Sequence, residues 1–379
     1  MCAAMRLAEH KPDCDVVIIG AGLIGLSAAD SLLEQGLSVI VVDQMPLPMA
    51  GTSARNSGML HPSQAQPWTI LGLPPLERRG AAAVVLSLAR RSAALIRAKA
   101  DALGLPQCAR AKGTVQIFED EVGRRGAAQT FDALGVPYRA QSVGSQFGGR
   151  PALYFPNDTS GNARSYGLAL ADDLAARGAQ ILSGQGASIW LEGGRAVGAR
   201  LGNRNIRAPH TVLAAGPQSG PIAARIGLTL PLKPLVGWSV NYRYEKGRVF
   251  LPDYPLSADC PVMDADSHSA LSIFGDILRV SGTAGQANES MLLARWEALI
   301  PGLFERLGPP LARPWRAERP MSLTGKPVIG RSSLPGLWIN TGHGHMGWTL
   351  CAGSGALMAD MIAHGQSDER FAVKQGRHA

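Results

Sequence analysis

The chain has 379 residues, of which 46% are hydrophobic, and its formal net charge at pH 7 is +8. Because folding units commonly hold about 150 residues, this length predicts two or three units, and we expect two. The positive charge comes mainly from arginines that stand singly or in pairs without a basic block, so the composition argues against nucleic-acid binding and leaves a weak attraction to anionic lipid headgroups open.

The sequence shows no signal for export, membrane insertion or cross-linking. Residues 1–12 lack the apolar core of a signal peptide, and no apolar run approaches the roughly 18 residues of a membrane span. We therefore expect a cytoplasmic protein, with peripheral association at the inner face of the membrane as the alternative. The five cysteines are Cys2, Cys14, Cys108, Cys260 and Cys351. They are scattered and never spaced as CxxC, so we expect free thiols, no disulfide framework and no metal site.

Residues 15–58 have the pattern of a dinucleotide-binding unit. The strand DVVIIG runs into a loop with Gly20, Gly22 and Gly25, a helix follows, and a second strand, VIVVD, ends at Asp43. The glycines allow a tight turn, a close approach of the backbone to a pyrophosphate, and close packing of the helix on the strand. The phosphates would then lie at the positive end of the helix, and Asp43 would accept the ribose hydroxyls. We predict an ADP-ribose site, with a ligand-free glycine turn as the alternative.

Strands dominate the second half of the chain. Helices are predicted at residues 76–103, 163–177 and 347–362. A strand at 179–183, a hairpin of SIWLE and RAVGARL, and the strand of PHTVLAAG form a returning β-meander. Further antiparallel strands are predicted at 116–118 and 236–244 and in the hairpin of ALSIF and ILRVSG. These strands would form a second sheet.

Several sequence blocks are distinctive when they occur together. They are DVVIIGAGLIGLS, TSARNSG, the strand pair around GWSV and LRVSG, RPMSLTGKPVIG, and NTGHGHMGWTLCAGSGALMADMI. The last block is the most specific, since NTGHGxxGWT followed by GSG is hard to generate by chance. Together the blocks resemble the D-amino-acid oxidase superfamily of FAD enzymes, and most closely the small subunit of bacterial D-amino-acid dehydrogenases. The segment 77–157 matches that family poorly and is shorter.

This resemblance implies an α/β fold with two domains. The first would be a Rossmann-like FAD-binding domain, with a mostly parallel sheet and a β-meander. The second would be an α+β substrate domain on an antiparallel sheet. We assign residues 13–90, 150–230 and 319–379 to the FAD-binding domain, and residues 91–149 and 231–318 to the substrate domain.

The resemblance also implies FAD as the cofactor, and no motif for a covalent link is evident. The residues that would contact FAD are Gly20, Gly22, Leu23, Ile24, Gly25, Asp43, Gln44, Thr52, Ser53, Arg55, Asn56, Ser57, Gly58, Ala187, Ala215, Gly216, Gly342, His343, Gly344, Met346, Gly347, Trp348 and Thr349. A helix that begins near Gly347 would point its free N–H groups at the cofactor. Its dipole would stabilise the negative charge of a reduced flavin.

Arg319 is the candidate anchor for the substrate. In the superfamily, an arginine before the proline of this block binds the substrate carboxylate, and the guanidinium fork can pair with both carboxylate oxygens. The family usually reads W-x-G-x-R-P, whereas this chain reads WRAERP, with Ala317 and Glu318 before the arginine. Glu318 could pair with Arg319, contact a substrate ammonium group or point to water.

Four more side chains are candidates for the catalytic site. His345 occupies a loop position where some amine oxidases of the superfamily place a second carboxylate-binding arginine. Tyr242 and Tyr244 lie on the strand where the family places substrate-contacting tyrosines, and strand alternation puts both on one face. His61 follows the TSARNSG block and could reach the flavin ring. A purely structural role is the alternative for each of the four.

The leading expectation for function is FAD-dependent oxidation of a small amino acid, first of all a D-amino acid. The Cα hydrogen would leave as a hydride to flavin N5, and the imino acid would hydrolyse to an oxo acid. One alternative is an oxidase or dehydrogenase for glycine or a secondary amine (sarcosine, D-proline or a hydroxyproline), alone or in a larger complex. Another is a non-catalytic flavin-binding redox subunit. Oxygen, a quinone and a partner protein are the candidate electron acceptors.

Overall fold

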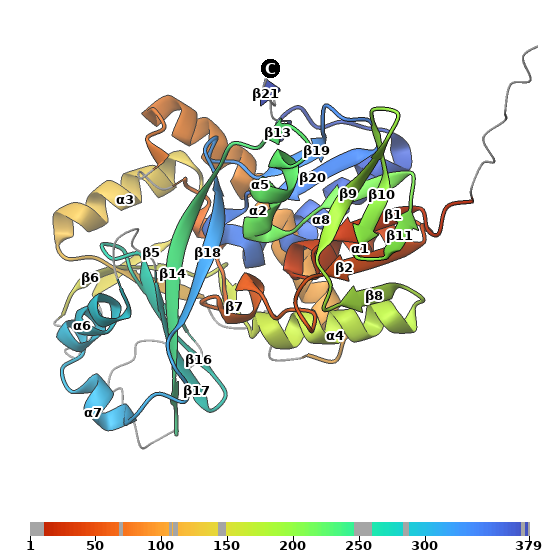
Figure 1. Cartoon of the computed structure of the whole chain (residues 1–379). Helices are drawn as coiled ribbons and strands as arrows, with labels where there is room; N and C mark the ends of the chain where they lie inside the picture. Colours follow the sequence, from red (N-terminus) through yellow and green to blue (C-terminus); the bar gives the residue numbers. More distant parts are fainter. Residues whose placement is uncertain are drawn as a thin grey trace, which may run out of the picture.

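The computed structural model of the protein describes residues 11–67, 71–105, 108, 113–142, 149–245, 260–282, 288–372 and 376–377. Two sheets organise this part of the chain, a six-stranded sheet with its helices and an eight-stranded sheet beside it (Figure 1). The predicted α/β fold with a Rossmann-like sheet and a second, largely antiparallel sheet is therefore confirmed.

The six-stranded sheet has the order β19-β20-β12-β1-β2-β8. Its strands are β1 (Val16–Ile19), β2 (Val39–Asp43), β8 (Gln180–Ser183), β12 (His210–Leu213), β19 (Val328–Arg331) and β20 (Leu337–Thr341). All neighbours are parallel except β19, which runs antiparallel to β20. All four residues of β1 are buried, and this agrees with its continuous apolar sequence, because a parallel sheet is covered on both faces.

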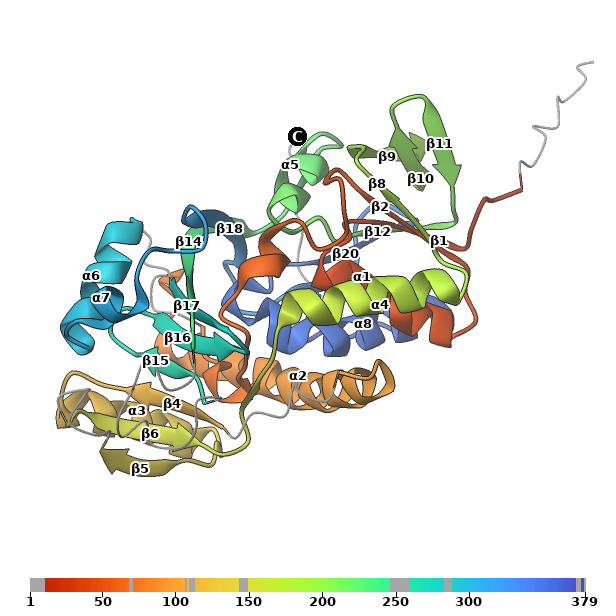
Figure 2. The same ribbon diagram turned by 90° about the horizontal axis from the view of Figure 1, so that it is seen from below.

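Helices cover one face of this sheet and the meander covers the other (Figure 2). The covering helices are α1 (Leu23–Glu34), α4 (Ala163–Ala176) and α8 (Gly347–His364), and α2 (Pro75–Ala102) packs against α8 in an outer layer. The meander strands are β9 (Ala187–Glu192), β10 (Arg195–Leu201) and β11 (Arg204–Arg207). The three predicted helices and the predicted meander are thus confirmed. A Cβ atom at Gly355 would lie 2.4 Å from the carbonyl oxygen of Ser27, so the small face of α8 lets it pack closely on α1.

The eight-stranded sheet has the order β18-β14-β17-β16-β15-β4-β6-β5. Its strands are β4 (Thr114–Ile117), β5 (Arg139–Ser142), β6 (Pro151–Phe155), β14 (Leu232–Arg243), β15 (Val262–Asp264), β16 (Ser269–Phe274), β17 (Ile277–Gly282) and β18 (Trp315–Ser322). Only the pair of β15 and β4 is parallel. The predicted hairpin and the strands at 116–118 and 236–244 are present.

Other elements connect and flank the two sheets. They are α3 (Glu121–Ala133), α5 (Ser219–Ala224), α6 (Glu289–Leu299), α7 (Leu303–Leu307), β3 (Met59–Leu60), β7 (Thr159–Ser160), β13 (Leu228–Thr229), β21 (Gly376–Arg377) and the 3₁₀ segments η1 (Thr52–Arg55), η2 (Pro62–Gln64), η5 (Gly216–Gln218) and η6 (Gly344–Met346). The division into two domains stays a prediction, and the pairing of β6 does not follow the predicted boundary. This strand falls in the segment assigned to the FAD-binding domain, yet it pairs within the eight-stranded sheet.

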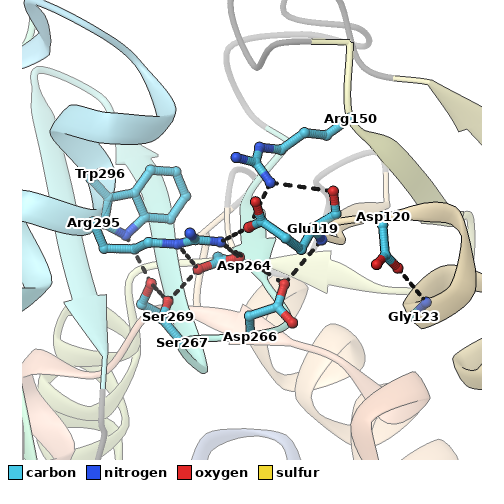
Figure 3. Close-up of polar contacts among 10 residues, drawn as sticks. All are labelled: Glu119, Asp120, Gly123, Arg150, Asp264, Asp266, Ser267, Ser269, Arg295 and Trp296. Atoms are coloured by element: carbon cyan, nitrogen blue, oxygen red, sulfur yellow. Dashed lines mark hydrogen bonds and ion pairs between the residues drawn. The ribbon is translucent and has the colours of Figure 1, made fainter.

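An ion-pair network fixes α6 to the eight-stranded sheet (Figure 3). Arg295 donates from Nε to Asp264 Oδ2 at 2.7 Å and from Nη2 to Asp264 Oδ1 at 3.0 Å. The same guanidinium lies 3.0 Å from Glu119, whose carboxylate is 2.6 Å from Arg150. Because Asp264 is fully buried, this pairing replaces the contacts with water that its carboxylate loses on folding.

Four of the five cysteines lie in the described residues. Cys14, Cys108, Cys260 and Cys351 are buried thiols, and none of them forms a disulfide there. Cys2 lies outside the described residues. Among the helices that the structure describes, none has both the length and the apolar character needed to cross a membrane.

Candidate active site

A cleft with about 780 Å³ of unfilled space lies where the carboxyl ends of the parallel strands face β14 and β18. Residues after β12, at the end of β20 and at the start of α1 form one wall, and residues of β14 and β18 form the other. The carboxyl edge of an open parallel sheet is the usual place of cofactor and substrate sites.

Many of the residues predicted for the site line this cleft. They are Leu23, Ile24, Thr52, Ser53, Arg55, Asn56, Gly216, Arg319, His343, Gly344, His345, Gly347 and Trp348. The TSARNSG block supplies η1, which is held against the start of α1 because Ser53 Oγ accepts the N–H of Leu23 at 3.2 Å. The C-terminal block supplies η6 and the first turn of α8, so the N-terminal end of this long helix borders the cleft.

The glycine loop has the close packing that its motif requires. A Cβ atom at Gly25 would lie 1.8 Å from the carbonyl oxygen of Gly20, so no larger residue fits there. Asp43 accepts the N–H of Ala21 at 2.6 Å and the N–H of Met45 at 2.7 Å. Its carboxylate therefore lies next to the loop, in the position predicted for ribose recognition.

Other predicted cofactor residues lie outside the lining of the cleft. They are Gly20, Gly22, Gly25, Asp43, Gln44, Ser57, Gly58, Ala187, Ala215, Gly342, Met346 and Thr349. Ala187 packs in the apolar cluster between the meander and the sheet. Thr349 Oγ1 accepts the N–H of His61 at 3.2 Å and donates to the carbonyl oxygen of Met59 at 3.4 Å. The first turn of α8 thus positions the chain that follows η1.

Arg319 lies on the cleft side of β18. Its Nη1 atom is buried and has no hydrogen-bond partner among the described residues. Burial lowers the pKa of the guanidinium to about 10, which leaves Arg319 cationic at neutral pH. The next residue back, Glu318, lies on the other side of the strand, with its carboxylate 3.7 Å from Arg316. Glu318 therefore does not neutralise the anchor.

Three histidines gather near the anchor. The rings of His61 and His345 stack with centroids 6.3 Å apart and planes inclined by 10°, and His345 Nε2 donates to the carbonyl oxygen of Gln64 at 3.2 Å. Burial lowers the pKa of His61 to about 4 and the pKa values of His343 and His345 to about 3, so all three rings are neutral at pH 7. His343 and His345 line the cleft, whereas His61 contacts it only through His345.

The two tyrosines predicted to contact the substrate lie in an apolar core instead. Tyr242 packs against Phe304 of α7 with ring centroids 5.2 Å apart, and Tyr244 belongs to the same cluster. Neither tyrosine lines the cleft. One face of β14 borders the cleft, and the other face packs against α6 and α7. Tyr242 and Tyr244 lie on the second face, so we place them in the core rather than in the substrate site.

Some lining residues were not singled out from the sequence. They are Ala214, Pro217, Gly237, Trp238, Trp315, Ala317, Pro320, Asn340 and Thr341. Asn340 is the clearest, because both polar atoms of its buried side chain lack a hydrogen-bond partner among the described residues. Its position as the first residue of the NTGHG motif could have indicated from the sequence that it belongs to the site. Trp315 is the first residue of the WRAERP motif, whereas Trp238 carried no such signal.

The fold and the cleft define a dinucleotide-binding protein in which a Rossmann-like sheet is joined to a second sheet that carries a buried cation. The chain belongs to the DAO family of FAD-dependent oxidoreductases, whose sequence profile matches residues 15–361. A D-amino acid dehydrogenase of Cereibacter sphaeroides is 30% identical over 405 residues, which cover 92% of this chain and 91% of that protein.

Two solved structures share the fold. Glycine oxidase from Geobacillus kaustophilus has a TM-score of 0.77 and 22% identity, and the match covers 97% of this chain and 100% of that one. L-proline dehydrogenase from P. horikoshii has a TM-score of 0.76 and 17% identity, with 94% and 95% covered. These likenesses show that this protein shares its two-sheet fold with both enzymes.

The residues of the cleft fit the FAD of this family. Buried polar atoms without partners in the described chain (Asn340 Oδ1 and Nδ2, His343 Nε2) are available to a polar ligand. The glycine loop and the start of α1 offer backbone N–H groups for phosphates, and the start of α8 at Gly347 offers a positive helix end. These elements and η1 are the ones that would hold FAD.

Proposed function

We propose that the protein oxidises the Cα–N bond of a small amino acid, and that a D-amino acid is its substrate. The observation that carries this proposal is Arg319, a cation whose buried Nη1 faces the cleft and has no hydrogen-bond partner among the residues that the structure describes. A substrate carboxylate would supply the missing partner through a charge-assisted, two-pronged contact. The name of the Cereibacter sphaeroides relative, D-amino acid dehydrogenase, supports the same reaction.

The residues of the chain act mainly by orientation. Arg319 would hold the carboxylate, and the neutral rings of His343 and His345 would offer hydrogen bonds without competing for it. Trp315, on the cleft side of β18, would restrict water. FAD, when bound, supplies the hydride acceptor. The substrate must enter with a neutral amine, because the nitrogen lone pair forms the C=N bond as the Cα hydrogen leaves with its electron pair. The resulting iminium ion then loses a proton to give the imino acid. Hydrolysis of the imino acid by water releases the oxo acid and ammonia.

The test is anaerobic reduction of the bound flavin. The FAD-loaded protein is mixed without oxygen with D-amino acids, their L-enantiomers, glycine, sarcosine and D-proline, and the loss of oxidised-flavin absorbance is followed. We expect D-amino acids to bleach the flavin fastest. Faster bleaching by sarcosine or D-proline would favour the secondary-amine alternative, and no bleaching by any compound would favour a non-catalytic redox subunit.

The electron acceptor follows from the same preparation. Once the flavin is reduced, its reoxidation by air, by a soluble quinone and by an artificial dye can be compared. Reoxidation by air within seconds would define an oxidase, and reoxidation by the quinone or dye alone would define a dehydrogenase. Peripheral membrane association stays a prediction, tied to a quinone acceptor.

A further inference from the structure

The cleft carries an excess of positive charge. Its described lining includes two arginines, Arg55 and Arg319, and no aspartate or glutamate. The substrate of the proposed reaction supplies one carboxylate, which Arg319 would take. The second arginine is therefore left without an anion in the site.

Arg55 is the last residue of η1, but its side chain reaches toward the other sheet. Its guanidinium carbon lies 5.4 Å from the ring centroid of Trp315. Trp315 and Arg319 are four residues apart on the cleft side of β18, so their Cα atoms are roughly 13 Å apart along the strand. The guanidinium of Arg55 therefore lies at the part of the cleft next to Trp315, away from the backbone of Arg319. No described carboxylate lies within ion-pair distance of it.

A third arginine adds to this positive field. Arg279 is buried, and within the described residues it donates to neutral acceptors, from Nη1 to the carbonyl oxygen of Asn56 at 2.7 Å and from Nε to Asn241 Oδ1 at 2.9 Å. Burial lowers its pKa to about 10, and the nearby charge of Arg55 contributes to this shift. Arg55 and Arg279 repel each other because both are cations, and a bound anion would offset the free-energy cost of this repulsion.

We expect the cofactor phosphates near the glycine loop rather than near the guanidinium of Arg55. Ser53, at the other end of η1, accepts the N–H of Leu23 and so marks the side of η1 that faces the glycine loop. Arg55 instead lies over Trp315 of the eight-stranded sheet. The nearest acid on β18, Glu318, lies 3.7 Å from Arg316. An anion that enters with the substrate is the partner that this geometry favours.

We propose that the amino acid oxidised here carries a second acidic group, which Arg55 binds while Arg319 holds the α-carboxylate. This inference rests on the proposed function and adds the substrate class. Because the two guanidinium groups lie at different parts of the cleft, we expect the second acidic group on the side chain of the substrate.

Binding of unreactive acids tests the inference without turnover. Glutarate and butyrate differ by one carboxylate, and each can be titrated into the FAD-loaded protein while the flavin absorbance spectrum is recorded. We expect glutarate to bind roughly 3- to 10-fold more tightly than butyrate, a modest factor because Arg55 is solvent-exposed. Arg55→Gln should remove the difference. Arg316→Gln, which changes a similarly exposed arginine outside the cleft lining, should keep it.

Turnover separates a failure of the inference from a failure of the proposed function. The parent enzyme should prefer D-glutamate to D-glutamine in kcat/KM, and Arg55→Gln should abolish the preference, whereas the control Arg316→Gln should keep it. Equal affinity for glutarate and butyrate, or loss of FAD from Arg55→Gln, would overturn the role of Arg55. If glutarate is preferred but no amino acid reduces the flavin, the proposed function fails and the diacid site stands.

Discussion

The guanidinium of Arg319 occupies the space that a side chain at Gly237 would fill: a Cβ atom at Gly237 would lie 2.5 Å from Arg319 Nη1 and 2.8 Å from its Cζ. The contact arises from the pairing of β14 with β18, in which Gly237 stands opposite Ala317 and Leu235 opposite Arg319. The anchor can therefore lie flat over β14 only because residue 237 has no side chain.

Gly237→Ala should displace the anchor without unfolding the protein. The added methyl group would push the guanidinium out of its place, so the KM for an amino acid should rise and kcat/KM should fall by roughly 10-fold or more, since each 1.4 kcal/mol is tenfold. Steady-state kinetics measures this. Gly220→Ala is the matched control, because a Cβ atom there meets nothing within 4 Å.

A double mutant shows whether Gly237 acts through Arg319. If it does, Gly237→Ala should cost little further activity once Arg319 is already alanine, because neighbouring positions in one contact are not additive. Independent, additive losses in the double mutant would contradict the positioning role.

Arg319→Ala should abolish most recognition of the substrate carboxylate. Removal of one partner of a buried charge pair costs about 2 to 5 kcal/mol, so kcat/KM should fall by roughly 30-fold to several thousandfold. Lysine should restore only part of the loss, because a point charge cannot make the two-pronged contact. The FAD content of the purified variant should match that of the parent.

An amide analogue of the substrate is the control for this variant. Without a carboxylate it should react poorly with the parent and lose little more with Arg319→Ala. Equal losses for the acid and the amide would mean that Arg319 supports the fold of β18 and does not hold the carboxylate.

Asp43→Ala should weaken the binding of FAD. The carboxylate accepts two backbone N–H groups beside the glycine loop and is placed to accept the ribose hydroxyls. Loss of a charge-assisted hydrogen bond costs about 1.5 to 3 kcal/mol, so the Kd for FAD, measured by titration of the apoprotein, should rise roughly 10- to 100-fold. Asp15→Ala is the control, because Asp15 also accepts a backbone N–H, from Ser38. An unchanged Kd for Asp43→Ala would refute the assignment.

Asp158 should make stability fall as the pH rises. Burial raises its pKa to about 6, against the pull of hydrogen bonds from Ser63 and Thr114. The unfolded carboxyl loses its proton near pH 4, but the folded one keeps it until about pH 6, so the unfolding free energy declines between these values. Relative to Asp158→Asn, the parent should lose about 1 kcal/mol between pH 5 and pH 7.5 in urea unfolding. Parallel curves for the two proteins would contradict a buried, protonated Asp158.

Arg295→Ala should destabilise the eight-stranded sheet. The substitution leaves the buried carboxylate of Asp264 without its cation, at a cost of about 3 kcal/mol, and thermal unfolding should show it. Arg243→Ala breaks a pair with Asp276 in which both side chains are more than half exposed, so its effect should stay below about 1 kcal/mol. Similar effects of the two substitutions would mean that the network of Arg295 adds little.

The sequence by itself was sufficient for the nucleotide-binding half of the molecule. The glycine loop, α1, β2 and Asp43 follow one another in the chain, and their contacts are local, so residue spacing alone specifies them. The predicted helices 76–103, 163–177 and 347–362 agree with α2, α4 and α8 for the same reason. Local periodicity and the positions of the glycines specify such elements, because they depend little on contacts between distant segments of the chain.

The tertiary structure alone decided which side chains meet in the cleft. The sequence could place Tyr242 and Tyr244 on one face of a strand, but α6, α7 and the cleft cover both faces of β14, and only the packing shows which face is which. The meeting of Arg319 with Gly237 and of Arg55 with Trp315 depends on pairing and packing between segments far apart in the chain. Such long-range pairing is set by the whole core, because a shift of one residue would turn every side chain to the other face.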